Sequence, residues 1–150
     1  MNTASGKGAG NLDFLDPTTW ATQIPSGPRR IYLSDTDDSL FVLIDPDDYE
    51  WASQWLWAPK KDKHGRKHYA YRTKTQRSGG VKASASIFLH KEVLERAGAK
   101  PPTEKHTIGD HRNGDSLDCR KINLRWATPS MNRRNINGCH PHDLTEAAYG

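Results

Sequence analysis

The sequence is short of cysteine and of long apolar segments. Only Cys119 and Cys139 occur in 150 residues, and apolar residues make up 34% of the chain, with a mean hydropathy of -0.88. No apolar run approaches the roughly 20 residues that span a bilayer, and the N-terminus lacks the apolar core of an export signal. Two distant cysteines in such a chain are expected to stay reduced. We therefore expect a cytoplasmic protein with no membrane partner.

The charged residues are unevenly distributed, although the net charge of +4 and the pI near 9.1 are only mildly basic. Residues 35–50 hold seven acids and no Lys or Arg. In contrast, residues 60–82 hold nine Lys or Arg against one Asp, and residues 111–135 hold six against two acids. Two separate basic segments suit a polyanion that lies across the surface. A solvated basic loop explains residues 60–82 equally well.

Composition divides the chain into four parts and indicates an α+β fold of small antiparallel hairpins and short helices. Residues 1–27 are rich in Gly, Ser, Thr and Pro and poor in apolar residues, so we expect a disordered or loosely attached arm. Residues 28–98 are expected to form a β-rich region with short helices. Residues 99–137 are expected to form a compact hairpin-plus-helix unit, and residues 138–150 a flexible tail.

The β-rich region is expected to contain two hairpins and two helices. We predict strands at 30–33, 40–44, 57–60 and 67–72, a loop at 73–82, a strand or entry turn at 85–89, and helices from Asp45-Pro46 and at 90–97. Asp45 suits a helix cap, and the acids within 47–50 suit the positive end of the helix dipole, so they need no catalytic role. The neighbouring aromatic residues are expected to pack beneath a sheet: Tyr49, Trp51, Trp55 and Trp57.

The unit at 99–137 contains the residues with the clearest chemical pattern. Asn113-Gly114 is a strong turn signal between Asp110-His111 and the later apolar run 122–127, so the chain is expected to fold back on itself. Thr128 can cap a helix whose first turn holds Pro129. This arrangement turns Asn132 back toward the first strand.

These residue types match the hydrolysis of a phosphodiester. Such a site needs a cation to neutralise developing charge and a base to activate water. Mg²⁺ prefers oxygen ligands and typically takes only one or two from the protein, so Asp110 and Asn132 can hold it. His111, with an ordinary pKa near 6.5, can accept a proton while neutral. Asn123 is better suited to fixing the loop through its amide.

The string from Asp110 to Asn135 resembles the HNH endonuclease family, in the phage and homing-type variant whose last signature residue is Asn. The resemblance implies a ββα-metal (His-Me finger) motif in a phage-infected or bacterial cell. It implies two catalytic-site residues, His111 as the general base and Asn123 as the residue that holds the loop. It also implies Asp110 and Asn132 as ligands of one Mg²⁺ or Mn²⁺. Residues 87–93, which contain His90, are similar to the segment that precedes the motif in these proteins. Residues 30–72 resemble, more weakly, the N-terminal sheet region of phage HNH proteins that sometimes carry AP2-like segments, which implies a DNA-binding segment within residues 28–98. Gly109 and Cys119 depart from the family pattern, and Gly109 is expected to loosen the first strand.

Double-stranded DNA is the expected partner of a monomer that nicks one strand per active site. The residues predicted to contact DNA are Arg66, Lys67, Arg72, Lys74, His90, Arg112, Arg125, Arg133 and Asn135. For His90, a core-edge position and a catalytic role stay open, and His64, His68 and His106 are expected to be exposed. A non-cleaving DNA-binding protein and a small RNA-binding domain are the alternatives. A structural zinc site that joins Cys119 to Cys139, His140 and His142 is not expected, because paired Cys-x-x-Cys motifs are absent.

Overall fold

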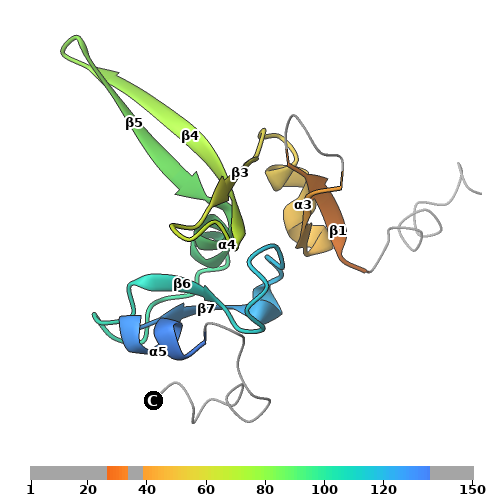
Figure 1. The fold of residues 1–150 in the computed structure, drawn as a ribbon. Helices are drawn as coiled ribbons and strands as arrows, with labels where there is room; N and C mark the ends of the chain where they lie inside the picture. Colours follow the sequence, from red (N-terminus) through yellow and green to blue (C-terminus); the bar gives the residue numbers. More distant parts are fainter. Residues whose placement is uncertain (1–26, 34–38, 136–150) are drawn as a thin grey trace, which may run out of the picture.

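A computed structural model describes residues 27–33 and 39–135 (Figure 1). Its elements are β1 (Arg29–Tyr32), β2 (Phe41–Ile44), α3 (Pro46–Ala52), β3 (Ala58–Lys61), β4 (His68–Ser78), β5 (Val81–Phe88), α4 (Leu89–Arg96), β6 (Ile108–His111), η1 (Lys121–Asn123), β7 (Leu124–Ala127) and α5 (Pro129–Arg134). Small antiparallel sheets and short helices confirm the α+β class. In the described part of the chain, no helix is long and apolar enough to cross a membrane. The predicted tail at 138–150 and all but the last residue of the predicted arm at 1–27 lie outside the described residues.

The strands form three separate antiparallel sheets, in the orders β1-β2, β3-β4-β5 and β6-β7. In β2 the alternate residues Val42 and Ile44 are fully buried, as the two-residue period of a strand with one covered face requires. The hairpin β6-β7 pairs Asp110 with Arg125 and His111 with Leu124. The fold therefore sets the predicted site on a two-stranded sheet.

One hydrophobic core joins the β-rich region to the unit at 99–137. It is built from Ile31, Leu33, Val42, Ile44, Ala52, Trp57, Ala70, Leu89, Val93, Leu94, Cys119 and Leu124. Trp57 is the largest fully buried side chain: its indole N–H donates to the carbonyl of Ala52 at 2.8 Å, and its ring stacks on Trp51. Trp55, in contrast, is exposed and lies under the guanidinium of Arg72. The prediction for the aromatic residues is therefore right for Trp57 and wrong for Trp55.

The loop before η1 fastens the first hairpin to the site. The backbone N–H of Leu43 donates to the carbonyl of Leu117, and the N–H of Cys119 donates to the carbonyl of Leu43. Asp45 occupies the N-cap position of α3 and Pro46 follows it, as predicted, but the Asp45 side chain makes no cap bond. Its carboxylate instead accepts the backbone N–H of Lys121 at 2.8 Å. The Lys121 ammonium pairs with Asp47 at 2.6 Å. A cation of the protein itself thus neutralises the acidic first turn of α3.

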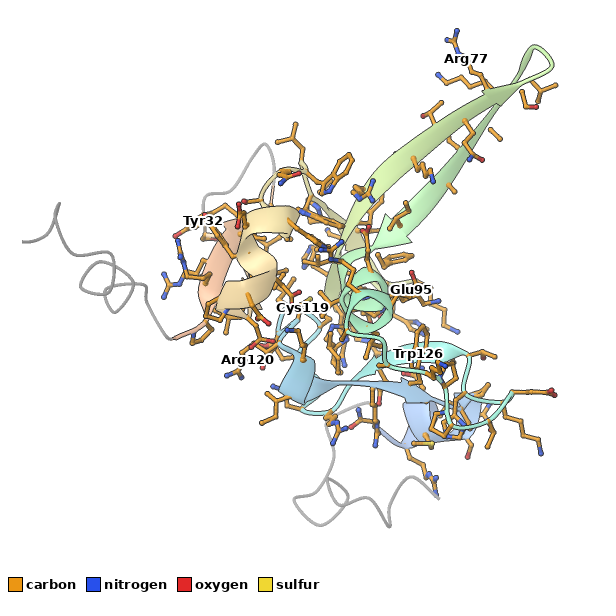
Figure 2. All side chains as sticks on the ribbon, turned by 180° about the vertical axis from the view of Figure 1, so that it is seen from behind. Tyr32, Arg77, Glu95, Cys119, Arg120 and Trp126 are labelled. Atoms are coloured by element: carbon orange, nitrogen blue, oxygen red, sulfur yellow. The ribbon has the colours of Figure 1, made fainter. Side chains whose placement is uncertain are left out.

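Strands β4 and β5 extend into a two-stranded arm that projects from the rest of the protein (Figures 1 and 2). We define the arm as residues 73–86, all of which are exposed. The predicted loop at 73–82 is wrong. Residues 73–78 instead pair with residues 81–86, and the turn is formed by Gly79 and Gly80, both with positive φ. The Gly-Gly pair marks the tip of a hairpin rather than a long loop.

Candidate functional site

The hairpin-plus-helix unit forms as its sequence signals predict. Strands β6 and β7 run antiparallel, and α5 follows β7 directly. The hydroxyl of Thr128 accepts the backbone N–H of Met131 at 3.2 Å, and Pro129 occupies the first helical position. This cap starts α5 beside the end of β6.

The turn after β6 is held by an amide from the returning chain. The Asn123 side chain accepts the backbone N–H of Asn113 at 3.0 Å and donates to the carbonyl of Asp118 at 2.9 Å. Gly114, at the turn, has a φ of 77°, which favours glycine. Asn123 is buried and does not line the cavity described next, so its contacts suit a loop-holding role.

A cavity of about 530 Å³ lies over the end of β6. Its lining comes from the β3-β4 turn, from β4, from β6 and its turn, and from α5: Asp62, Lys63, His64, Arg66, Lys67, Tyr69, Gly109, Asp110, His111, Gly114, Ser116, Asn132, Arg133 and Asn135. Lys67 donates to the carbonyl of Gly114 at 2.9 Å, and Ser116 donates to the carbonyl of His68 at 2.6 Å. These two bonds fasten the basic turn over the site.

His111 is buried at the end of β6. Its Nε2 lies 3.9 Å from Sγ of Cys119, and its ring centroid lies 4.7 Å from that of His90 and 5.9 Å from that of Tyr69. Burial lowers the pKa of His111 from 6.5 to about 4, and nearby carboxylates oppose this only in part. At neutral pH the imidazole is therefore uncharged, which is the form that accepts a proton.

Asp110 lies in a buried network with Arg125 and Asn135. Oδ2 of Asp110 accepts Nε of Arg125 at 2.9 Å and Nδ2 of Asn135 at 2.9 Å. Burial raises the pKa of Asp110, while the bonds from Arg125 and Asn135 act in the opposite direction. Nδ2 of Asn135 also donates to the carbonyl of His111 at 2.7 Å. One amide thus joins the Asp110 carboxylate to the backbone of His111.

The donor set fits a divalent cation. Both bonds from Asn135 need its NH₂ group, so its amide oxygen must point away from Asp110 and His111. That oxygen is buried and has no hydrogen-bond partner among the described residues. Asn132, on the exposed side of α5, lines the same cavity. A carboxylate beside two amides is the kind of ligand set that Mg²⁺ accepts.

The nine residues predicted to contact DNA fall into different environments. Arg66, Lys74 and Arg133 are exposed, and Lys67 and Arg112 are half-buried. Arg72 is half-buried in an ion pair with Glu92 at 2.8 Å. Three others are buried: His90, Arg125 and Asn135. They contact His111 or Asp110, and only Asn135 of the three lines the cavity.

Two features of the site were not predicted from the sequence. Tyr69 of β4 lines the cavity, and burial, followed by Asp62 and Asp110, raises the pKa of its hydroxyl. His64 is exposed as expected but lines the cavity as well, whereas His106 is buried, contrary to expectation. The contact of the β3-β4 turn with β6 joins segments about 45 residues apart, and no local pattern signals it.

Cys119 lies in the shared core behind His111, near the centre of the protein in Figure 2. It is 1% exposed, and burial raises the pKa of its thiol far above the ordinary range. The other three residues of the zinc hypothesis lie outside the described residues.

No protein-family model, curated protein or solved structure matches the chain. A functional assignment therefore depends on these residues and their geometry.

Proposed function

We propose that the chain is a metal-dependent DNA endonuclease of the HNH type, which nicks one strand per active site. The observation that carries the proposal is the placement of a neutral, buried His111 beside Asp110, with Asn132 on α5, Asn135 at the C-terminal end of that helix, and a cavity open to all four. A base and a cation site side by side are the two requirements for cutting a phosphodiester.

His111 would act as the general base. Its uncharged imidazole accepts the proton of a water molecule that attacks phosphorus, and the bond from phosphorus to the leaving oxygen breaks. When bound, a divalent cation supplies charge neutralisation at the phosphate and the leaving oxygen. Asp110 and an amide from α5 or its C-terminal end would hold that cation, and the bond from Arg125 orients the Asp110 carboxylate.

The lining of the cavity supports a polyanionic substrate. Four cationic side chains line it, from the β3-β4 turn and from α5: Lys63, Arg66, Lys67 and Arg133. The arm adds Lys74, Arg77 and Lys82 and contains no acid. Arg77 lies near the tip of the arm (Figure 2). A two-stranded β-ribbon is narrow enough to enter the major groove of DNA, so the arm offers a contact beyond the scissile phosphate.

Plasmid cleavage tests the proposal. Supercoiled plasmid is incubated with the protein and Mg²⁺, with and without chelator, and the parent is compared with His111→Ala, Asn132→Ala and Asn135→Ala. We expect Mg²⁺-dependent open-circle product that His111→Ala reduces at least about 100-fold, as loss of a general base does. Arg134→Ala, an exposed change on the same helix, serves as the matched control.

The second candidate is a non-cleaving DNA-binding protein, and the exposed basic arm is the observation that favours it. Stoichiometric DNA binding without any open-circle product in Mg²⁺ or Mn²⁺ would support this candidate and refute the nuclease proposal. Retention of full cleavage by His111→Ala would refute the assignment of the base.

A further inference from the structure

His90 occupies an unusual position against the strand that carries the site. It is 6% exposed, and its ring centroid lies 4.7 Å from that of His111 at an interplanar angle of 56°. Tyr69 lies 5.9 Å from both imidazole rings. Three rings from β4, α4 and β6 therefore pack together, two of them in the cavity wall and His90 behind it.

Gly109 makes this packing possible. A Cβ atom at position 109 would lie 2.7 Å from Cδ2 and 3.2 Å from Nε2 of His90, and 3.1 Å from Cγ of Lys91. The lysine stem can move, but the His90 ring is enclosed. The predicted loosening of the strand by Gly109 is not seen, because β6 pairs along its full length with β7. The missing side chain instead leaves room for the His90 ring.

We infer that His90 is a positioning residue for His111: its ring, seated on the bare backbone of Gly109, fixes the His111 imidazole for proton transfer. The inference rests on the proposed nuclease function of the same site. Glycine inside a strand and histidine in an apolar interior are each unfavourable for stability. In an ordinary hydrophobic core, leucine at position 90 and alanine at position 109 would be more favourable for stability. We therefore attribute the presence of His90 and Gly109 to their effect on His111.

A double-mutant cycle tests the inference. His90→Ala and Gly109→Ala are made singly and together, with Gly27→Ala as control, since a Cβ at Gly27 meets nothing within 4 Å. Single-turnover nicking in Mg²⁺, DNA affinity in chelator and the imidazole ring resonances of His111 by NMR are measured for each. Thermal melting verifies the fold, and His90→Gln replaces His90→Ala as the background if the latter does not fold.

Each single substitution is expected to slow nicking on the order of 10- to 100-fold, since misplacement of a catalytic group by about 1 Å has such an effect. DNA affinity is expected to stay within about twofold, because the change acts on the reacting group and not on binding. In the double variant Gly109→Ala is expected to add nothing to His90→Ala, since its Cβ then has room. The His111 ring resonances are expected to move in both single variants.

Two outcomes would overturn the inference. One is that Gly109→Ala slows nicking equally in the presence and absence of His90, which would show that its effect does not pass through the His90 ring. The other is that the His111 resonances are unchanged in both single variants. The resonances need no catalysis, so a parent protein that fails to nick refutes the proposed function while the NMR result still decides whether His90 holds His111.

Discussion

The protonation of His111 couples the chemistry of the site to the stability of the fold. Its pKa is about 4 in the folded chain, because of burial, and near 6.5 when unfolded. Between these values the unfolded chain binds more protons, so the free energy of unfolding falls as pH drops from 6.5 toward 4. The free energy of unfolding therefore reaches its full value above pH 6.5. Burial also lowers the pKa of His90, so protonation of His90 at low pH destabilises the fold in the same way.

We expect the parent chain to lose about 2 kcal/mol of stability through His111 alone between about pH 7.5 and about pH 5. His111→Gln is expected to lose correspondingly less. Urea unfolding in chelator at the two pH values measures this, with the exposed His64→Gln as the control. An identical pH dependence in the parent and in His111→Gln would contradict the assigned shift.

The pair formed by Asp110 and Arg125 is the most buried ion pair in the described part of the chain, with the two side chains 7% and 8% exposed. Removal of one partner of a buried pair leaves an uncompensated charge and costs about 3–5 kcal/mol. We expect Arg125→Met to destabilise the protein by this amount, measured by urea unfolding. The double variant with Asp110→Asn and Arg125→Met is expected to recover part of the lost stability, because it no longer contains an unpaired buried carboxylate.

Exposed Arg134→Met is the control for the ion pair and is expected to change stability by no more than about 0.5 kcal/mol. If the losses of the two single substitutions at 110 and 125 simply add in the double variant, the residues are not coupled, and the role of Arg125 in orienting Asp110 would be wrong.

Among the elements, the arm of residues 73–86 is the best target for separating the proposed DNA binding from the proposed cleavage. Its side chains are exposed and make no part of the core. Replacement of residues 76–83 by Asn-Gly joins the paired residues Thr75 and Ser84 through a two-residue turn and removes Arg77 and Lys82. We expect unchanged thermal stability and weaker DNA binding.

Because each of the two removed cations is expected to neutralise one phosphate, the slope of log K against log salt should become shallower by about 2. A full-length arm that carries Arg77→Gln and Lys82→Gln is the matched control, and it separates the effect of charge from the effect of shape. DNA affinity and salt slope equal to those of the parent in the shortened variant would show that the arm does not meet DNA.

The elements also show how far the sequence can be used to predict this fold and its site. The strand, turn, strand and capped helix of residues 108–134 follow from Asn113-Gly114 and Thr128-Pro129, because these signals act within a few residues. The arm was predicted as a loop because its strands alternate small and polar residues and cover no apolar face. Its pairing depends on the register set by Tyr71 and Phe88 at its base.

The site was predicted less completely than the hairpin that carries it. Asp110, His111 and Asn132 follow from residue type and spacing, and all three line one cavity. The bond from Asn135 to Asp110 and the packing of His90 on Gly109 join residues 25 and 19 positions apart in different elements. Only the tertiary fold decides such contacts, so the sequence places these residues near the site without giving their roles.

For the whole molecule, the shared core means that the hairpin-plus-helix unit is not expected to fold alone. Within residues 99–135 the buried apolar side chains are Cys119, Leu124 and Ala127. Burial of a Leu-sized side chain contributes roughly 1.5–3 kcal/mol, which does not offset an ordering entropy of about 1.5 kcal/mol per residue over the unit. The stabilising partners come from outside it, among them Ile44 and Val93.

We therefore expect a fragment of residues 99–137 to show no cooperative thermal transition by circular dichroism, whereas residues 27–137 melt as one unit with a single transition. The same comparison in a cleavage assay should show no nicking by the short fragment, because it is expected to be unfolded and because it lacks the β3-β4 turn that contacts Gly114 and Ser116. A cooperative melt of the short fragment would show that the unit is an independent domain and that the β-rich region serves DNA binding alone. If residues 27–137 did not fold, the prediction would be wrong, because residues outside this range would then be needed to stabilise the fold.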